Sequence, residues 1–298
     1  MKYKKIDYCR MCGCKNYEPY YTTSFGGSDD KEGHIIRNVQ VVKCKQCGFI
    51  YSSEVLTKES ANSFWNLYSN KVHQCDPKAN EYRSIMYTLE YDYISKFFTK
   101  NSPKTVLDVG CANGGFLEHF YDDGWECYGV EIDEENGELI NENVKVYFEE
   151  FPNIDFKDKY FDLIIFRGTI IYFDNPQLYF EKAIERLNPE GYIYITSTPN
   201  PESFCYEIFK GQSKIPVCGI AQNGFTKTYL IKYFNEKGFL LSGDRCFYEE
   251  TPYANILEDI EMVYKAIDYQ KKGKKIDFQS PPFWGNMMTL VFRKDSIL

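Results

Sequence analysis

The chain has 298 residues, of which 43% are hydrophobic and 26% charged, and its formal net charge is −8 at pH 7. This length suffices for one large α/β domain with a small appendage, and the acidic balance argues against nucleic acid as a partner, because neutralising phosphates needs a surplus of Lys and Arg. No apolar run approaches the roughly 20 residues that span a bilayer, and the first residues lack the apolar core of a signal peptide, so we expect a soluble cytoplasmic protein with no membrane partner.

Two cysteine turns of identical pattern lie near the N-terminus. Each reads C-x-x-C-G, the first with Cys9 and Cys12 and the second with Cys44 and Cys47. Such a turn aims two thiolates at one point, and two turns together complete a tetrahedral site for Zn²⁺. Cys14 is an alternative to Cys12, which we favour because a glycine follows it, as in the second turn. A site closed by four thiolates leaves no position for substrate, so the metal is expected to stabilise the fold.

The first 102 residues are predicted to form a zinc-binding domain and a helical connection. We expect a zinc ribbon over residues 1–59, with a hairpin between the two cysteine turns whose second strand lies near residues 35–42. Apolar residues then recur at helical spacing up to residue 100, which predicts a helical linker or lid over residues 60–102.

A glycine-bearing turn follows the first strand of the next segment. Asp108, Gly110, Ala112 and Gly114 alternate with other residues after a β-branched run, and a helix is expected to begin beyond them. A second strand ends at Glu131, whose carboxylate can accept both hydroxyls of a ribose. Nicotinamide-binding turns read G-x-G-x-x-G, and this turn lacks that spacing. The pattern indicates a different nucleoside-bearing cofactor, held at the C-terminal edge of a parallel sheet.

Strands and helices alternate from residue 103 onward, which is typical of a doubly wound α/β fold. We predict one domain over residues 103–298, with a Rossmann-like sheet of seven strands. The expected strands lie near residues 105–109, 126–131, 144–148, 161–166, 191–196, 239–248 and 286–293. The expected helices lie near residues 114–123, 134–141, 176–188 and 226–237.

Two segments are longer than ordinary connections in a compact domain. The first, near residues 199–225, emerges at the ligand-binding edge of the sheet, so we assign it to substrate binding. The second, near residues 249–283, contains an amphipathic helix that either covers the site or forms a contact in a homodimer.

The order of these features resembles the class I S-adenosylmethionine-dependent methyltransferases that carry an N-terminal zinc-binding domain. The turn from Asp108 to Gly114 resembles motif I of that family, with Ala112 at the middle glycine position. The acidic end of the second strand and the segments at residues 160–167 and 187–200 also match. This grouping includes sugar methyltransferases of antibiotic and cell-surface polysaccharide pathways. The resemblance implies S-adenosylmethionine as the cofactor and Zn²⁺ as a structural ion.

The resemblance assigns one part of the cofactor to the turn and the second strand. Gly110, Ala112 and Gly114 would line the methionine part. Asp108 would lie behind them, near the ammonium group, and Glu131 would bind the ribose hydroxyls.

The same resemblance assigns further cofactor contacts to the ends of the next two strands. Phe148 and Glu149 resemble the pair that contacts adenine, and Ile132 would cover the adenine face. Arg167 occupies a place that often touches the methionine part, and a surface ion pair is the alternative.

Methylation of a hydroxyl requires that the hydroxyl lose its proton, usually to a positioned base. Related sugar C-methyltransferases carry a Glu-His pair after the fourth strand, where this chain has Ile171 and Tyr172. That departure argues against C-methylation. We consider His73 first as the base, and Tyr172 and Tyr68 as alternatives.

We favour methyl transfer to a small molecule, namely a hydroxyl of a sugar or nucleotide sugar in cell-surface polysaccharide or related biosynthesis. One alternative is an RNA methyltransferase whose zinc ribbon binds nucleic acid, and another is a non-catalytic cofactor-binding protein. The acidic charge and the lack of an Asn-Pro-Pro-aromatic motif after the fourth strand disfavour RNA.

Overall fold

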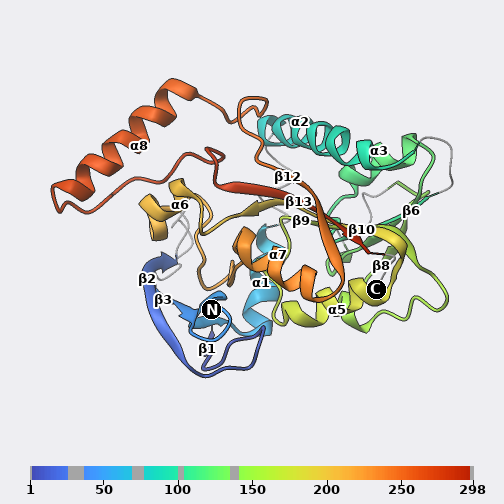
Figure 1. Cartoon of the computed structure of the whole chain (residues 1–298), viewed down its shortest axis with the longest axis horizontal. Helices are drawn as coiled ribbons and strands as arrows, with labels where there is room; N and C mark the ends of the chain where they lie inside the picture. Colours follow the sequence, from blue (N-terminus) through green and yellow to red (C-terminus); the bar gives the residue numbers. More distant parts are fainter. Residues whose placement is uncertain (1, 26–36, 69–76, 100–103, 135–140, 296–298) are drawn as a thin grey trace.

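A mixed sheet of seven strands forms the centre of the molecule (Figure 1). The computed structural model describes residues 2–25, 37–68, 77–99, 104–134 and 141–295. The strands of this sheet are β6 Thr105–Val109, β7 Glu126–Val130, β8 Lys145–Tyr147, β9 Phe161–Arg167, β10 Leu187–Pro199, β12 Phe239–Arg245 and β13 Met287–Lys294. They lie in the order β12-β13-β10-β9-β6-β7-β8.

The strands from β10 to β8 are parallel, and β13 runs antiparallel between β10 and β12. This arrangement confirms the predicted doubly wound α/β sheet of seven strands. Some boundaries differ, because β10 extends over Leu187–Pro199 rather than residues 191–196, and β12 ends at Arg245 rather than near residue 248. Residues 188–191 form an irregularity in the pairing of β10 with β9, with Glu190 at a φ of 61°, and therefore belong to the strand rather than to a helix end.

Helices cover both faces of the sheet because successive side chains of a strand point to opposite sides. Val106 packs in one cluster with α2 (Pro77–Ile94) and α3 (Gly115–Asp122). Leu107 packs in another cluster with α5 (Pro176–Glu185) and α7 (Lys227–Glu236). Each layer of helices therefore buries its own half of the central strands.

The predicted helical linker consists of two helices in the described residues. α1 (Lys58–Tyr68) precedes α2, and a short 3-10 turn at Ser95–Phe97 follows α2. The connection between α1 and α2 lies outside the described residues, as do residues 135–140, where most of another predicted helix falls.

The N-terminal part forms two small sheets beside α7 (Figure 1). Its strands are β1 Tyr3–Lys5, β2 Tyr17–Phe25, β3 Arg37–Cys44, β4 Ile50–Ser52 and β5 Glu54–Leu56. The antiparallel pairing of β2 with β3 confirms the predicted hairpin, whose turn lies outside the described residues. A strand from the first insertion, β11 (Asn223–Gly224), joins β4 and completes the sheet β11-β4-β3-β2.

The N-terminal strands share their core with the large sheet. The ring centroid of Phe49 lies 4.9 Å from that of Phe225 and 5.4 Å from that of Tyr229 on α7. Cys9 and Cys44 belong to the same buried cluster as these aromatic residues.

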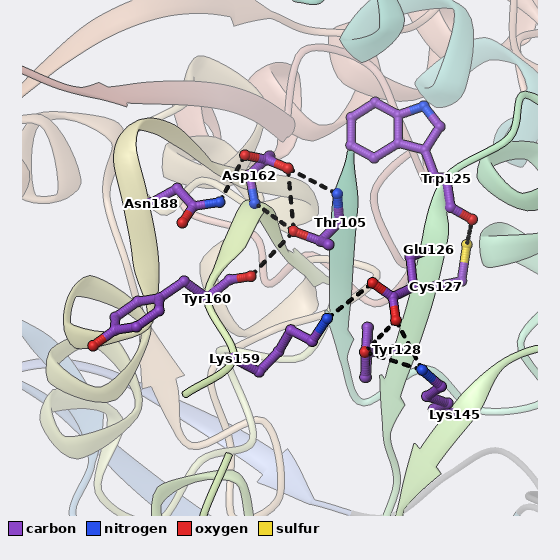
Figure 2. Close-up of polar contacts among 10 residues, drawn as sticks. All are labelled: Thr105, Trp125, Glu126, Cys127, Tyr128, Lys145, Lys159, Tyr160, Asp162 and Asn188. Atoms are coloured by element: carbon purple, nitrogen blue, oxygen red, sulfur yellow. Dashed lines mark hydrogen bonds and ion pairs between the residues drawn. The ribbon is translucent and has the colours of Figure 1, made fainter. Parts of the chain in front are cut away.

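Polar side chains fasten the N-terminal ends of the central strands (Figure 2). The carboxylate of Asp162 accepts hydrogen bonds from the backbone N–H of Thr105 at 2.8 Å and from the Asn188 amide at 2.7 Å. Glu126 at the start of β7 pairs with Lys145 at 2.8 Å and with Lys159 at 2.9 Å. These contacts stabilise the N-terminal edge of the sheet, which lies opposite to the motif I turn. The C-terminal edge is therefore the one available to ligands.

The second insertion contributes α8 (Ile256–Lys271), which lies at one end of the molecule (Figure 1). Val263 and Ala266 on its inner face pack against residues of α6 (Phe204–Phe209). Its outer face exposes large apolar side chains, such as Leu257 at 77% and Tyr264 at 74%, among charged residues. Within the described ranges, every helix is too short or too polar to traverse a lipid bilayer.

Candidate functional site

The motif I turn leaves β6 in a left-handed backbone conformation. Gly110, Ala112 and Gly114 have φ values of 82°, 49° and 73°, which favour glycine at two of these positions and are uncommon for alanine. The N–H of Gly110 donates to the carbonyl of Val130 at 2.8 Å, so the turn is fixed to the end of β7. α3 begins at Gly115, immediately after this turn.

Gly110 also lies against the loop that follows β9. A Cβ atom at this position would be 2.6 Å from Cγ2 of Thr169. A side chain therefore cannot fit without displacing Thr169, and the turn and the loop after β9 form adjoining walls of the site.

Asp108 lies at the last but one position of β6 and is 2% exposed. Among the described residues, none donates a hydrogen bond to its Oδ1 atom. Burial raises the pKa of Asp108 to about 7, against the opposing effect of the Arg167 cation. Because an unsatisfied buried acceptor is costly, this oxygen fits a site that receives a cationic donor from a ligand.

Glu131 connects the motif I turn to the end of β7. Its carboxylate accepts hydrogen bonds from the backbone N–H groups of Ala112 at 2.9 Å, Ile132 at 2.7 Å and Asp133 at 3.1 Å. Burial raises the pKa of Glu131, and these three donors oppose that effect. The carboxylate is therefore held in one orientation at the strand end, where Oε2, which accepts from Ala112, keeps a lone pair for a ribose hydroxyl.

Two exposed apolar side chains flank this carboxylate. The N–H of Glu131 donates to the carbonyl of Tyr147 at 3.1 Å, which places the ends of β7 and β8 side by side. Ile132 is 56% and Phe148 44% exposed just beyond these two strands. Glu149 accepts from the N–H of Glu150 at 2.9 Å. An exposed aliphatic and an aromatic side chain at adjacent strand ends suit the two faces of a purine.

Arg167 forms a buried ion pair with Glu90 of α2, a residue that the sequence did not single out. Its Nε lies 2.6 Å from Oε2 of Glu90, and its guanidinium carbon lies 4.5 Å from the ring centroid of Tyr87. Burial acts to lower the pKa of Arg167, and the Glu90 charge outweighs it, so the pKa is raised. Arg167 therefore forms a buried ion pair with Glu90 rather than a surface one, and its contact with the methionine part of the cofactor stays a prediction.

Glu90 also accepts hydrogen bonds from two hydroxyls at the end of β10. It is fully buried and accepts from Oγ1 of Thr196 at 2.8 Å and from Oγ of Ser197 at 2.6 Å. Ser197 has a φ of 48°, where the pairing of β10 with β13 is irregular. This strained position turns its hydroxyl toward Glu90, and such strain is concentrated at functional sites.

The three suggested bases differ in how far the structure describes them. Tyr172 lies in the loop after β9, and its ring stands edge-on to Trp65 of α1 at a centroid distance of 4.7 Å. The side chain of Tyr68 and the whole of His73 lie outside the described residues. A role for any of the three as base stays a prediction.

The four predicted zinc ligands meet at one point. The sulfur atoms of Cys9, Cys12, Cys44 and Cys47 all lie within 4.8 Å of one another. Two of the sulfur pairs, Cys9 with Cys47 and Cys12 with Cys44, are 3.6 Å apart. A tetrahedral site with Zn–S bonds of about 2.3 Å has edges of about 3.8 Å, so the cluster fits such an ion.

The two cysteine turns have the same backbone geometry. The N–H of Gly13 donates to the carbonyl of Cys9 at 2.7 Å, and the N–H of Gly48 donates to the carbonyl of Cys44 at 2.9 Å. Both glycines have positive φ values, 71° and 78°. The hydrogen bond from the Cys9 thiol lowers the pKa of Cys47 to about 5, which favours the thiolate that a metal binds.

The sheet order, the turn after β6 and the carboxylate at the end of β7 define a class I methyltransferase, an enzyme that uses S-adenosylmethionine. A family model described as "Methyltransferase domain" matches residues 81–261, and the chain belongs to this family. No curated protein matches the chain.

Two solved structures show the same fold. One is a SAM-dependent methyltransferase of Thermotoga maritima, described as a possible histamine N-methyltransferase. It is 15% identical with a TM-score of 0.53, and the match covers 77% of this chain and 98% of that chain. The other is a putative methyltransferase of Bacillus halodurans, 18% identical with a TM-score of 0.51, and the match covers 68% of this chain and 97% of that chain.

Proposed function

We propose that the chain transfers a methyl group from S-adenosylmethionine to a hydroxyl of a small molecule, of the sugar or nucleotide-sugar class. The observation that carries the cofactor site is the Glu131 carboxylate, which three backbone N–H groups orient beside the motif I turn. The sugar class rests on the sequence resemblance, and the acidic net charge of −8 supports a small acceptor over RNA.

In this proposal each part of the cofactor has its own residues. Glu131 binds the ribose, and Ile132 and Phe148 cover the adenine, with Glu149 at its edge. The turn of Gly110, Ala112 and Gly114 lies along the methionine part. Asp108 receives the ammonium group, and Arg167, which Glu90 holds in place, contacts the methionine part.

The chain's own contribution to the chemistry is position, exclusion of water and removal of a proton. When bound, S-adenosylmethionine supplies a methyl group that is already activated on a sulfonium. The acceptor oxygen must then lie in line with it at about 3 Å. The proposed base is His73, and Tyr172, in the loop beside the motif I turn, and Tyr68 are the alternatives. We propose Cys9, Cys12, Cys44 and Cys47 as ligands of a structural Zn²⁺.

Calorimetry with S-adenosylhomocysteine tests the cofactor site. Replacing Glu131 by Gln removes a charged acceptor, so binding should weaken roughly 10- to 100-fold. Glu126→Gln is the matched control, because Glu126 stands at the opposite end of the same strand. We expect its affinity to stay within about twofold of the wild type. Equal affinities of the wild type and Glu131→Gln would contradict the site.

Transfer of a labelled methyl group to a panel of nucleotide sugars tests the acceptor class. We expect product from at least one member of the panel, and none from RNA under the same conditions. Tyr172→Phe keeps the ring against Trp65 and removes the hydroxyl, so a loss of turnover of about 100-fold would support Tyr172 as the base. Labelled RNA without labelled sugar would overturn the proposed acceptor.

A further inference from the structure

We propose that Arg10, which stands inside the first cysteine turn, is a positioning residue for the loop after β9, so that the metal-binding turn holds the candidate active site in place. We call residues 169–174 the β9 loop. The functional meaning of this inference rests on the proposed function, because the β9 loop carries Tyr172 and borders the motif I turn.

The Arg10 side chain is buried and contacts two segments far along the chain. It is 3% exposed, and its Nη1 atom donates to Oε1 of Gln222 at 2.6 Å. Its Nη2 atom lies 3.9 Å from the carboxylate of Asp174, at the end of the β9 loop. The buried guanidinium of a residue that lies between two proposed zinc ligands in the sequence therefore contacts a segment more than 200 residues later in the chain.

Gln222 and its neighbour Asn223 in turn bind the β9 loop through four consecutive carbonyls. The Gln222 amide donates to the carbonyl of Tyr172 at 2.5 Å, and the Asn223 N–H donates to that of Ile171 at 3.0 Å. The Asn223 amide donates to the carbonyls of Ile170 at 3.1 Å and Phe173 at 2.8 Å. This pattern fixes the backbone of the loop rather than one side chain, so the position of the whole loop depends on residues 222 and 223.

Residues 222–224 are held from the other side by the zinc ribbon. Asn223 pairs with Tyr51 and Gly224 with Ile50 of β4, and the N–H of Ser52 donates to the carbonyl of Gln222 at 3.0 Å. A Cβ atom on Gly224 would be 3.0 Å from Ile50, so the two segments are in close contact. Residues 222–224 therefore lie between β4 and the β9 loop and bond to both, so a shift of the N-terminal strands would shift the β9 loop.

Hydrogen exchange of the full-length, zinc-loaded protein tests this inference. The reporters are the N–H groups of Tyr172 and Asn223, which donate to Thr169 and Ile171. Arg10→Met and Gln222→Met break the connection on either side of the Arg10–Gln222 hydrogen bond. We expect both to speed exchange at the two reporters about fivefold or more, which corresponds to one lost hydrogen bond. Arg10→Lys keeps a cationic donor and should restore part of the protection.

Two controls separate positioning from a general loosening of the ribbon. Lys4→Met removes a 2.9 Å contact with the same Asp174, but that pair is exposed, so the reporters should not change. The N–H groups of Gly13 and Gly48 report the cysteine turns themselves and should stay protected, with one zinc ion per chain. A merely structural role of Arg10 would instead expose these glycines and leave Tyr172 protected.

Withdrawal of zinc from the wild type by a chelator tests the part that the metal plays. We expect faster exchange in the β9 loop as well as in the cysteine turns. Unchanged exchange at Tyr172 and Asn223 in folded Gln222→Met, or after chelation, would overturn the inference. No cofactor or acceptor is present in these experiments, so failure to bind S-adenosylhomocysteine would overturn the proposed function and leave this inference standing.

Discussion

Asp108 combines burial with an oxygen that no described residue satisfies, and its pKa is raised to about 7. An ammonium group binds the ionised carboxyl, which is the minor form at pH 6 and the major form at pH 8. We therefore expect the affinity for S-adenosylhomocysteine to rise about tenfold over this interval. Calorimetry at several pH values measures this change, and in Asp108→Asn the affinity should be low and nearly independent of pH.

The raised pKa of Asp108 also predicts the direction in which the free energy of unfolding changes with pH. The folded pKa lies above the ordinary value of 3.8, so between about pH 4 and pH 7 the folded state holds a proton that the unfolded state has lost. The contribution of Asp108 to the free energy of unfolding therefore falls as pH rises through this window. Denaturant titrations should show Asp108→Asn gaining stability relative to the wild type as pH increases, and a constant difference would refute this.

Substitution of Gly110 tests how closely the motif I turn approaches the β9 loop. Gly110→Ala meets both a φ of 82° and the Thr169 methyl group at 2.6 Å, so we expect a loss of about 2–4 kcal/mol in the free energy of unfolding. Gly124→Ala is the matched control, because it has the same φ of 82° with no atom within 4 Å of the new Cβ. Its loss should be about 1–2 kcal/mol. Equal losses would show that Thr169 moves aside freely.

Among elements, α2 packs on the sheet through apolar side chains and also places one buried charge, Glu90, against it. Glu90→Gln leaves the Arg167 guanidinium without its carboxylate partner, and breaking a buried pair costs about 3–5 kcal/mol. Asp268→Asn, which breaks an exposed pair between Asp268 of α8 and Lys272 just after that helix, should cost less than about 0.5 kcal/mol. Thermal and denaturant unfolding compare the two. A small effect of Glu90→Gln would mean that α2 is held by its apolar face alone.

The elements also show where sequence reasoning succeeds and where it ends. The motif I turn and Glu131 could be predicted because their pattern is local, a strand followed by glycines and a second strand ending in a carboxylate. Glu90 gave no such signal, since it lies 77 residues before Arg167 and more than 100 residues before Thr196 and Ser197. A glutamate in a helix usually faces solvent, and only the assembled sheet places this one inside.

The same limit applies to β11, which has two residues and belongs to a sheet formed mainly by the N-terminal part. The length of the first insertion indicated a functional loop. Nothing in its sequence indicated that it pairs with β4, because such pairing depends on contacts between distant segments. The cluster of four cysteines, in contrast, could be predicted because the same C-x-x-C-G spacing occurs twice.

At the scale of the whole molecule, the N-terminal strands and the methyltransferase sheet share one apolar core. The sequence predicts a domain boundary at residue 59, and this boundary stays a prediction. The contacts of Phe49 with Phe225 and Tyr229 instead lead us to expect a single calorimetric unfolding transition. Chelation of zinc should lower the midpoint of that one transition rather than remove a separate early one.

Two cysteine variants make this expectation specific. Cys44→Ser removes a buried ligand and should lower the midpoint as chelation does. Cys246→Ser changes an exposed cysteine outside the cluster and should leave the midpoint unchanged. Two resolved transitions, with only the first sensitive to zinc, would show that the ribbon unfolds on its own.

The pairing of β4 with β11 also determines when the small N-terminal sheet can form during synthesis of the chain. Tyr51 leaves the ribosome about 170 residues before its partner Asn223. At about 5–20 residues per second, this corresponds to a wait of roughly 10 to 30 s. Throughout that interval the edge of β4 and the ring of Phe49 have no covering surface, and they are available to chaperones or to neighbouring nascent chains.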